Sequence, residues 1–314
     1  MANKHVPLIL TVIASLTFIF PPTLIKLLID EISPIGALTV RFFIAALGFP
    51  IIISVIHKDK LKSVIYSNQK ELAHFAAVAF LLCISMAVLF SSYYFIPANK
   101  AMLIFLIYPV FDSIFAWAFL KERIAKITIV AIILSVIGAY FILGVNVEGK
   151  SHSIVGYILA ILGMLMFAGY LVMSRSVGKH YDYYKRTTWL FIFSFFFLCI
   201  VFFFAGGIET IHKLSPVSWL WLIMFGTIST LVPYTLLSYT TAKINASVVS
   251  IIVLVGPALA IGLVTLIFNE PFTTSMIIGS VCVLAAFIIT TLAEWYEEEN
   301  IPKKKHKKHW YVHH

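Results

Sequence analysis

One apolar stretch of this chain occurs twice, and this duplication constrains the fold more than any other feature. The stretch from Ala98 reads ANKAMLIFLIYPVFDSIFAWAFLKERI, and the stretch from Ala246 reads ASVVSIIVLVGPALAIGLVTLIFNEPF. Three landmarks coincide at one offset of 148 residues: Ala98 with Ala246, Pro109 with Pro257, and Glu122 with Glu270. A fixed period of this size predicts a molecule built from two related halves.

Both stretches are long and apolar enough to cross a membrane, and the composition agrees with this. Hydrophobic residues make up 61% of the chain and charged residues 12%, with a mean hydropathy of +0.99. Soluble chains carry about 25% charged residues. The sequence therefore predicts an all-α polytopic membrane protein, and its net charge of +9 is explained by topology rather than by nucleic-acid binding.

Ten apolar runs predict ten transmembrane helices. They are expected at about 6–29, 33–56, 71–95, 98–120, 125–145, 153–176, 187–206, 216–240, 246–268 and 272–293. Of the 23 lysines and arginines, 18 fall on the side of the N-terminus and 3 on the other side. The excess of positive charge predicts that both termini are cytoplasmic, in what we expect to be a bacterial inner membrane.

Five spans in each half place the second half upside down relative to the first. We expect residues 1–148 and 149–293 to form two inverted five-helix repeats, and residues 294–314 to form a charged cytoplasmic tail. Phe18 and Lys26 also align with Phe167 and Arg175, at an offset of 149. Inverted repeats place a central site between the halves that can open to either side, which favours transport.

These motifs resemble the EamA-type branch of the drug/metabolite transporter superfamily. The resemblance covers nearly the whole chain and also rests on DEISPIGALTVRFFIAAL from Asp30 and FAGYLVMSR from Phe167. It implies a basket-like bundle of ten helices whose central cavity is lined by spans 1, 3, 4, 6, 8 and 9. Family members often have a Trp-Gly-Ser-Asn-like run in the first span, where this chain has Phe18-Ile19-Phe20-Pro21-Pro22.

Four prolines within the spans are candidate hinges: Pro21, Pro22, Pro109 and Pro257. Each removes a backbone donor and leaves a carbonyl free to bind a ligand or to act in gating. The alternative is a static kink whose free carbonyls are satisfied by neighbouring helices.

Two charged residues lie deep within predicted spans, Arg41 in span 2 and Asp112 in span 4. A charge at the bilayer centre costs roughly 2.5–3.5 kcal/mol on insertion scales, so each needs compensation. We expect Arg41 and Asp112 to pair with each other. The alternatives are that Asp112 is a proton-coupling site or that Arg41 binds an anionic group of the solute.

Charges near the ends of the spans have simpler expected roles. Lys26 is expected to extend its ammonium group towards the membrane surface. Glu122 and Glu270 are expected to cap helices or to pair with basic neighbours.

Polar aromatic and amide side chains are the remaining candidates for solute contacts: Tyr108, Tyr170, Tyr234, Tyr239, Asn99 and Asn245. Tyrosines bind organic solutes through their ring faces and their hydroxyl groups. The alternative for tyrosines near the ends of spans is the interfacial aromatic belt.

The predicted function is a secondary carrier of small organic metabolites, such as amino acids or related compounds, that works by alternating access. Family analogy favours export. The expected partners are a small-molecule solute, the lipid bilayer and protons as a candidate coupling ion, with no nucleic acid, cofactor or metal, in a monomer or homodimer. Alternatives are a drug or organic-cation exporter, an uptake carrier for a host metabolite, and a non-transporting membrane scaffold. An enzyme is disfavoured because few ionisable residues lie within the spans.

Overall fold

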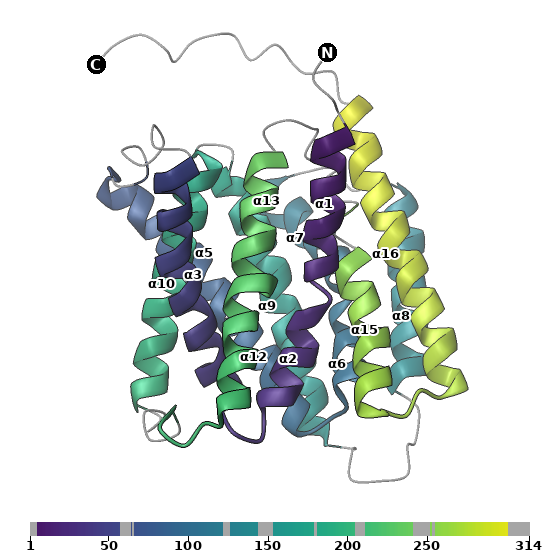
Figure 1. Ribbon diagram of the computed structural model, residues 1–314. Coiled ribbons are helices and arrows are strands. Elements are labelled where there is room, and N and C mark those ends of the chain that lie inside the picture. The colour runs from purple at the N-terminus through teal and green to yellow at the C-terminus, as the bar shows by residue number, and fades with distance from the viewer. Residues whose placement is uncertain are drawn as a thin grey trace.

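The computed structural model describes residues 5–56, 64, 66–121, 126–143, 153–178, 181–204, 211–240, 252 and 255–300. Within these residues the regular structure is helical (Figure 1). The elements of the first half are α1 (His5–Thr17), α2 (Phe20–Leu28), α3 (Pro34–Ile56), α5 (Gln69–Ser91), η1 (Ser92–Tyr94), α6 (Ala98–Phe105), α7 (Tyr108–Leu120) and α8 (Lys126–Leu143). Those of the second half are α9 (Ile154–Gly178), α10 (Tyr183–Phe204), α12 (Pro216–Gly226), η2 (Thr227–Leu231), α13 (Val232–Thr240), α15 (Val255–Phe268) and α16 (Thr274–Asn300).

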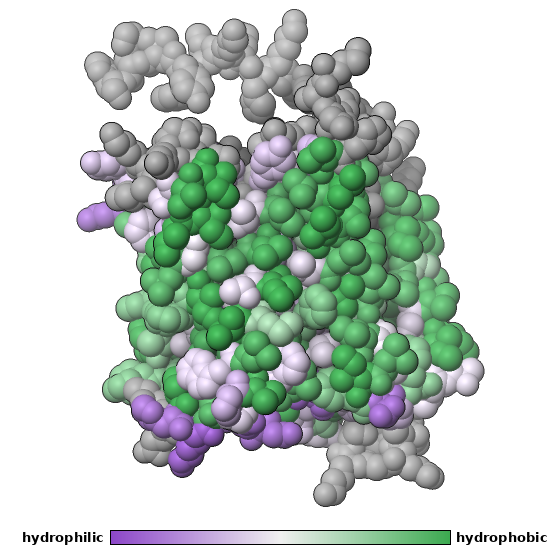
Figure 2. Space-filling model, viewed as in Figure 1, coloured by the Kyte–Doolittle hydropathy of each residue, from purple (hydrophilic) through white to green (hydrophobic). Residues whose placement is uncertain are grey.

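The apolar helices of the described residues match the ten predicted spans in order. Seven are long and apolar enough to cross a membrane, and shorter apolar helices occur at Ile129–Ile142, Val255–Phe268 and Thr274–Ile289. Figure 2 shows a hydrophobic surface along the side of the bundle, with hydrophilic residues gathered at its lower end. This is the surface expected for helices that are surrounded by lipid.

Prolines divide two of the spans into pairs of helices. The first span is interrupted after Thr17, and Pro21 and Pro22 lie in the first turn of α2. The fourth span is interrupted after Phe105, and Pro109 lies in the first turn of α7. Proline is tolerated there because the first-turn amides have no partner within the helix. The predicted breaks at these prolines are therefore present, whereas their role in gating stays a prediction.

The two halves are interleaved rather than side by side. Helix α9 packs along α5, α10 lies against α3 and α5, and α13 lies against α1. The pair α8 and α16 contains the last helix of each half and packs at one side of the bundle (Figure 1). The buried core therefore lies mainly where the halves meet, and not within each half.

The structure repeats a backbone feature at the sequence offset. Among the described residues, two that are not glycine have a positive φ angle, Lys121 at 56° and Asn269 at 48°. They are 148 residues apart. Lys121 directly follows the last residue of α7, and Asn269 directly follows the last residue of α15. A left-handed residue is a common way to end a helix, so both repeats stop this helix in the same way.

Candidate functional site

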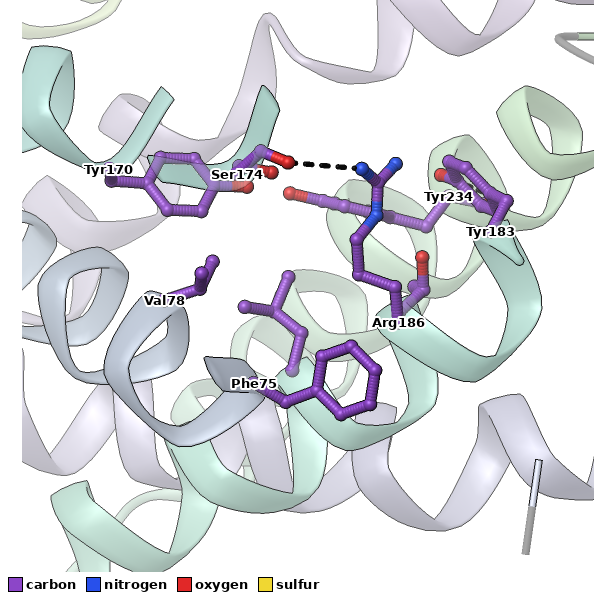
Figure 3. A pocket seen from close by; sticks show the side chains of 9 residues that line it. Phe75, Val78, Tyr170, Ser174, Tyr183, Arg186 and Tyr234 are labelled. Carbon is purple, nitrogen blue, oxygen red and sulfur yellow. Dashed lines mark hydrogen bonds between the residues drawn. The ribbon is translucent and has the colours of Figure 1, made fainter. Parts of the chain in front are cut away.

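A small cavity lies between the halves, towards the end of the bundle where α1 begins. Its volume is about 70 Å³. Helix α5 of the first half contributes to its wall, and α9, α10 and α13 of the second half provide the rest (Figure 3). The lining residues are Phe75, Val78, Tyr170, Ser174, Tyr183, Arg186, Thr187, Leu190 and Tyr234.

Polar groups around this cavity are held by contacts between helices. Arg186 donates from Nη1 to the carbonyl oxygen of Ser174 at 3.2 Å, and its guanidinium lies 5.7 Å from the centre of the Tyr183 ring. Tyr183 in turn donates its hydroxyl to the carbonyl oxygen of Tyr234 at 3.3 Å. Figure 3 shows the Arg186 side chain between Ser174 of α9 on one side and Tyr183 and Tyr234 on the other. The cavity therefore combines one cation, hydroxyl groups and aromatic faces.

A larger groove of about 390 Å³ lies between α5, α9 and α10. Its lining side chains are apolar apart from Cys83 and Ser91, and several of them, including Phe80 and Val201, are exposed on the side of the bundle. It offers no charged group to orient a polar solute, so the smaller cavity is the better candidate site.

The predicted tyrosines are only partly gathered at the cavity. Tyr170 and Tyr234 line it, and Tyr239 does not. Tyr108 is buried in an aromatic cluster, with ring centres 5.2 Å from those of both Phe105 and Phe167. Asn245 lies outside the described residues. Two of the four predicted tyrosines therefore line the cavity.

The prediction that Arg41 pairs with Asp112 is wrong. Arg41 donates from Nε to the hydroxyl of Thr230 at 2.7 Å, and its guanidinium lies 4.6 Å from the centre of the Phe225 ring. The reason is helix placement: α3 packs against α10, α12 and η2, while Asp112 is on α7, which packs against α9 and α16. Arg41 and Asp112 were expected to pair because of their positions along spans 2 and 4, but their helices have different main neighbours.

Asp112 instead pairs with Arg175 of α9. Arg175 Nη2 lies 2.9 Å from Asp112 Oδ1, with the acid 8% and the arginine 36% exposed in their side chains. This ion pair joins the two halves, because α7 and α9 belong to different halves. Arg175 directly follows Ser174, a residue of the cavity wall, along α9.

At the opposite end of the bundle, a second cross-half contact is formed by Glu270. Its carboxylate accepts the backbone N–H groups of Ala98 at 2.8 Å and Asn99 at 2.7 Å, which begin α6. Lys26 lies 3.6 Å from the same carboxylate. We call Lys26, Glu270 and these two amides the Glu270 cluster.

The Glu270 cluster settles several predictions. The capping and pairing roles predicted for Glu270 are both confirmed, whereas Glu122 lies outside the described residues. Lys26 forms an ion pair rather than only extending to the surface. Asn99 is a structural residue here, since its amide nitrogen donates to the Thr265 hydroxyl and to the Pro271 carbonyl, both at 3.2 Å.

The first and ninth spans meet at Ser15 and Gly256. Gly256 donates its N–H to the Ser15 hydroxyl at 3.1 Å, and a Cβ at Gly256 would lie 2.3 Å from the Ser15 carbonyl oxygen. Pro257 follows directly, in the first turn of α15. Ser15 thus satisfies an amide at the start of α15, and the two proline-containing spans are in direct contact.

Sequence reasoning missed Arg186, Tyr183 and Ser174 as cavity residues. Arg186 was counted only as one of the positive charges that set the topology. The available signal was spacing: Tyr183 and Arg186 are three residues apart and therefore share one face of α10. Among the described residues, no group of three or more His, Cys, Asp or Glu side chains is placed to hold a metal ion.

Comparison with known proteins agrees with this architecture. The EamA-like transporter family matches residues 5–144 and again residues 154–292. An uncharacterized transporter of Clostridium kluyveri is 27% identical over 263 residues, covering 82% of this chain and 83% of that protein. The uncharacterized transporter YetK of Bacillus subtilis is 26% identical over 192 residues, covering 59% of this chain and 57% of that protein.

The fold also occurs among solved structures. One crystal structure of a protein aligns with a TM-score of 0.61 at 15% identity, covering 94% of this chain and all of that chain. At this identity the likeness concerns the fold alone.

Proposed function

Because the chain belongs to the EamA-like transporter family, we propose that it is a secondary carrier that moves small organic metabolites by alternating access. Amino acids and related compounds are the proposed solutes, and export is the proposed direction. The repeats are proposed to comprise residues 1–148 and 149–293, with residues 294–314 as a tail.

The main support for this proposal is a difference between the two ends of the bundle, since one end contains a cavity and the other is held closed by contacts between helices. The cavity lies between the halves near one end, while the Glu270 cluster ties α2, α6 and α15 together at the other end. A carrier that exposes its site to one side at a time needs such a closed contact on the opposite side. We place the cavity end in the cytoplasm, so this is an inward-facing or occluded arrangement.

Proton coupling is proposed to act through Asp112. Protonation of its carboxylate would break the ion pair with Arg175, so proton binding and this ion pair between α7 and α9 exclude each other. Such a link would connect the movement of the halves to a proton gradient, in a chain where no nucleotide-binding motif is evident.

The proposed function is tested by a thermal-shift screen followed by flux assays. A ligand that binds only the folded protein raises its melting temperature by mass action. We expect stabilisation by one class among amino acids, amines, nucleosides and sugar phosphates, and counterflow of that class in proteoliposomes. If no class is carried, the non-transporting scaffold is the better explanation.

Orientation is tested separately by cysteine labelling. In a variant that lacks the native cysteines, we expect Lys213→Cys to react with a membrane-impermeant reagent in intact cells and Asn68→Cys to be protected. Labelling of both from outside would contradict cytoplasmic termini and the inward-facing assignment.

A further inference from the structure

Arg41 is a buried cation without a carboxylate partner among the described residues. The residue is 2% exposed, and its contacts are the Thr230 hydroxyl, the sulfur of Met86 at 3.8 Å, and the rings of Phe42 and Phe225. None of these neutralises its charge. A guanidinium held in this way costs free energy unless something else compensates it.

Three other cations of the bundle have an acidic partner. Lys26 pairs with Glu270, Arg175 pairs with Asp112, and Lys185 lies 2.5 Å from Glu71. Acidic residues therefore occur within this bundle, but none of those in the described residues pairs with Arg41. Intramembrane ionisable residues that face the bundle interior commonly mark a solute pathway.

The backbone around Arg41 is also irregular. Its partner Thr230 lies in η2, a π-helical turn, and the Thr230 hydroxyl donates to the carbonyl oxygen of Phe225 at 2.9 Å. Pro233 follows this turn and cannot donate to Ser229, which accounts for the break in the regular bonding pattern. Single π-helical turns within α-helices are frequent at functional sites.

Thr230 relates Arg41 to the cavity. It accepts the hydrogen bond of Arg41 and lies four residues before Tyr234, which lines the cavity wall. Arg186, which also lines the cavity, likewise has no carboxylate partner in the described part of the chain. The nearest acid along the helix, Asp182, is exposed and accepts the backbone N–H of Tyr184 at 3.3 Å.

The nine residues that line the cavity include one cation and no acid. With Arg41 bonded to Thr230, one helical turn before Tyr234, the fixed charge of this region is positive. Such a field attracts anions and repels cations. It argues against the organic-cation exporter that the sequence left open.

We infer that Arg41 and Arg186 bind an anionic group of the transported solute, a carboxylate or a phosphate, within the tyrosine-lined cavity. The planar fork of donors on arginine matches both groups, and the aromatic side chains of Tyr170, Tyr183 and Tyr234 line the cavity for contacts with the rest of the solute. This inference rests on the proposed function, since it names the class of solute for the same site.

The test measures binding to the purified full-length protein in lipid nanodiscs by calorimetry. The probes are acetate, butyrate and benzoate, their neutral counterparts acetamide, butyramide and benzamide, the cation butylamine, and inorganic phosphate. We expect at least one carboxylate or phosphate to bind, and each amide and the amine to bind more weakly. Carboxylate and phosphate results distinguish the two kinds of anion.

Variants then assign the binding to the arginines. Arg41→Met and Arg186→Met should each weaken anion binding by roughly 30-fold or more, the loss typical of a truncated buried charge contact. Lys185→Met removes the same charge one residue from Arg186 but faces Glu71, so it should leave the anion affinity unchanged. Arg41→Lys should retain part of the binding.

Melting temperatures separate this role from a structural one. If Arg41 is kept for its ligand, Arg41→Met should lose anion binding without a fall in melting temperature, because an uncompensated charge has been removed. A lower melting temperature with unchanged anion affinity would assign Arg41 to packing alone and overturn the inference.

Two further outcomes would also overturn it: no probe anion binds at millimolar concentration, or butylamine binds as well as butyrate. Failure of the proposed function is distinguishable, because it would appear as absence of flux in proteoliposomes while anion binding to the wild-type protein persists.

Discussion

Lys26 and Arg175 occupy equivalent positions in the two halves, 149 residues apart, and each forms an ion pair with an acid of the opposite half. Lys26 pairs with Glu270 at 3.6 Å and Arg175 pairs with Asp112 at 2.9 Å. The first contact lies where α2, the start of α6 and the end of α15 meet, and the second joins α7 to α9. The basic residue at this repeated position therefore forms a different ion pair between the halves in each repeat.

The Glu270 cluster should depend far more on the acid than on the lysine. Glu270→Gln removes a charged acceptor from two backbone N–H groups at a site where the side chain is 7% exposed. We expect a loss of about 2 kcal/mol in the free energy of unfolding. Lys26→Met removes a longer, more exposed ion pair and should cost less than about 1 kcal/mol. Thermal unfolding in detergent measures both, and an equal or reversed order would contradict the capping role.

Asp112→Asn should remove the pH dependence of transport if proton coupling acts through this residue. Asparagine keeps the shape of the side chain and can still accept a bond from Arg175, but it cannot take up a proton. The measurement is counterflow in proteoliposomes across a pH series, using whichever solute the screen identifies. A variant that transports with the wild-type pH profile would rule out Asp112 as the coupling site.

Glu31 should make stability depend on acid pH. The backbone N–H and hydroxyl of Ser215, with the hydroxyl of Ser218, hold the pKa of this carboxyl below its ordinary value of 4.5. Since the folded pKa is the lower one, this contribution is fully present above pH 4.5 and is lost as the pH falls through the folded pKa.

The test compares melting temperatures of the wild type and Glu31→Gln. The difference between them should be constant from neutral pH down to about the ordinary pKa and should shrink below it. A difference that stays constant into the acid range would show that the bond to Ser215 does not depend on the charge of Glu31.

Close packing of α5 against α9 should depend on Gly163. A Cβ at this position would lie 2.8 Å from both the Cβ and the backbone nitrogen of Leu89, so the helices would have to move apart. Gly163→Ala is expected to cost about 1–3 kcal/mol in the free energy of unfolding.

The matched control lies on the same helix. A Cβ at Gly169 would meet nothing within 4 Å, so Gly169→Ala should be neutral or gain up to about 1 kcal/mol of helix propensity. Similar melting temperatures for the two variants would mean that α5 and α9 are not packed as closely as the structure indicates.

Much of the fold was predictable from local patterns. The duplicated stretch, the breaks at Pro21, Pro22 and Pro109, and the capping role of Glu270 all followed from residue type and position along the chain. Each of these depends on the backbone of one helix or on its end, where proline geometry and unpaired amides leave few possibilities.

The contents of the site were much less predictable. Tyr170 and Tyr234 were predicted to face the cavity and do so, but Tyr108 packs within the core and Asn99 serves the Glu270 cluster. Arg186 was not predicted as a cavity residue, because a basic residue near the start of a span normally indicates only how the protein is oriented in the membrane.

The sequence by itself determined that this chain is a helical membrane protein of two related halves, because hydropathy and repetition are properties of the chain alone. Only the tertiary structure decided which charges pair, leaving Arg41 with Thr230 and joining Asp112 to Arg175. The physical reason is that lipid and protein interior are both apolar. A membrane helix therefore shows little difference between its lipid-facing and inward-facing sides, and its neighbours are set by packing between helices far apart in sequence.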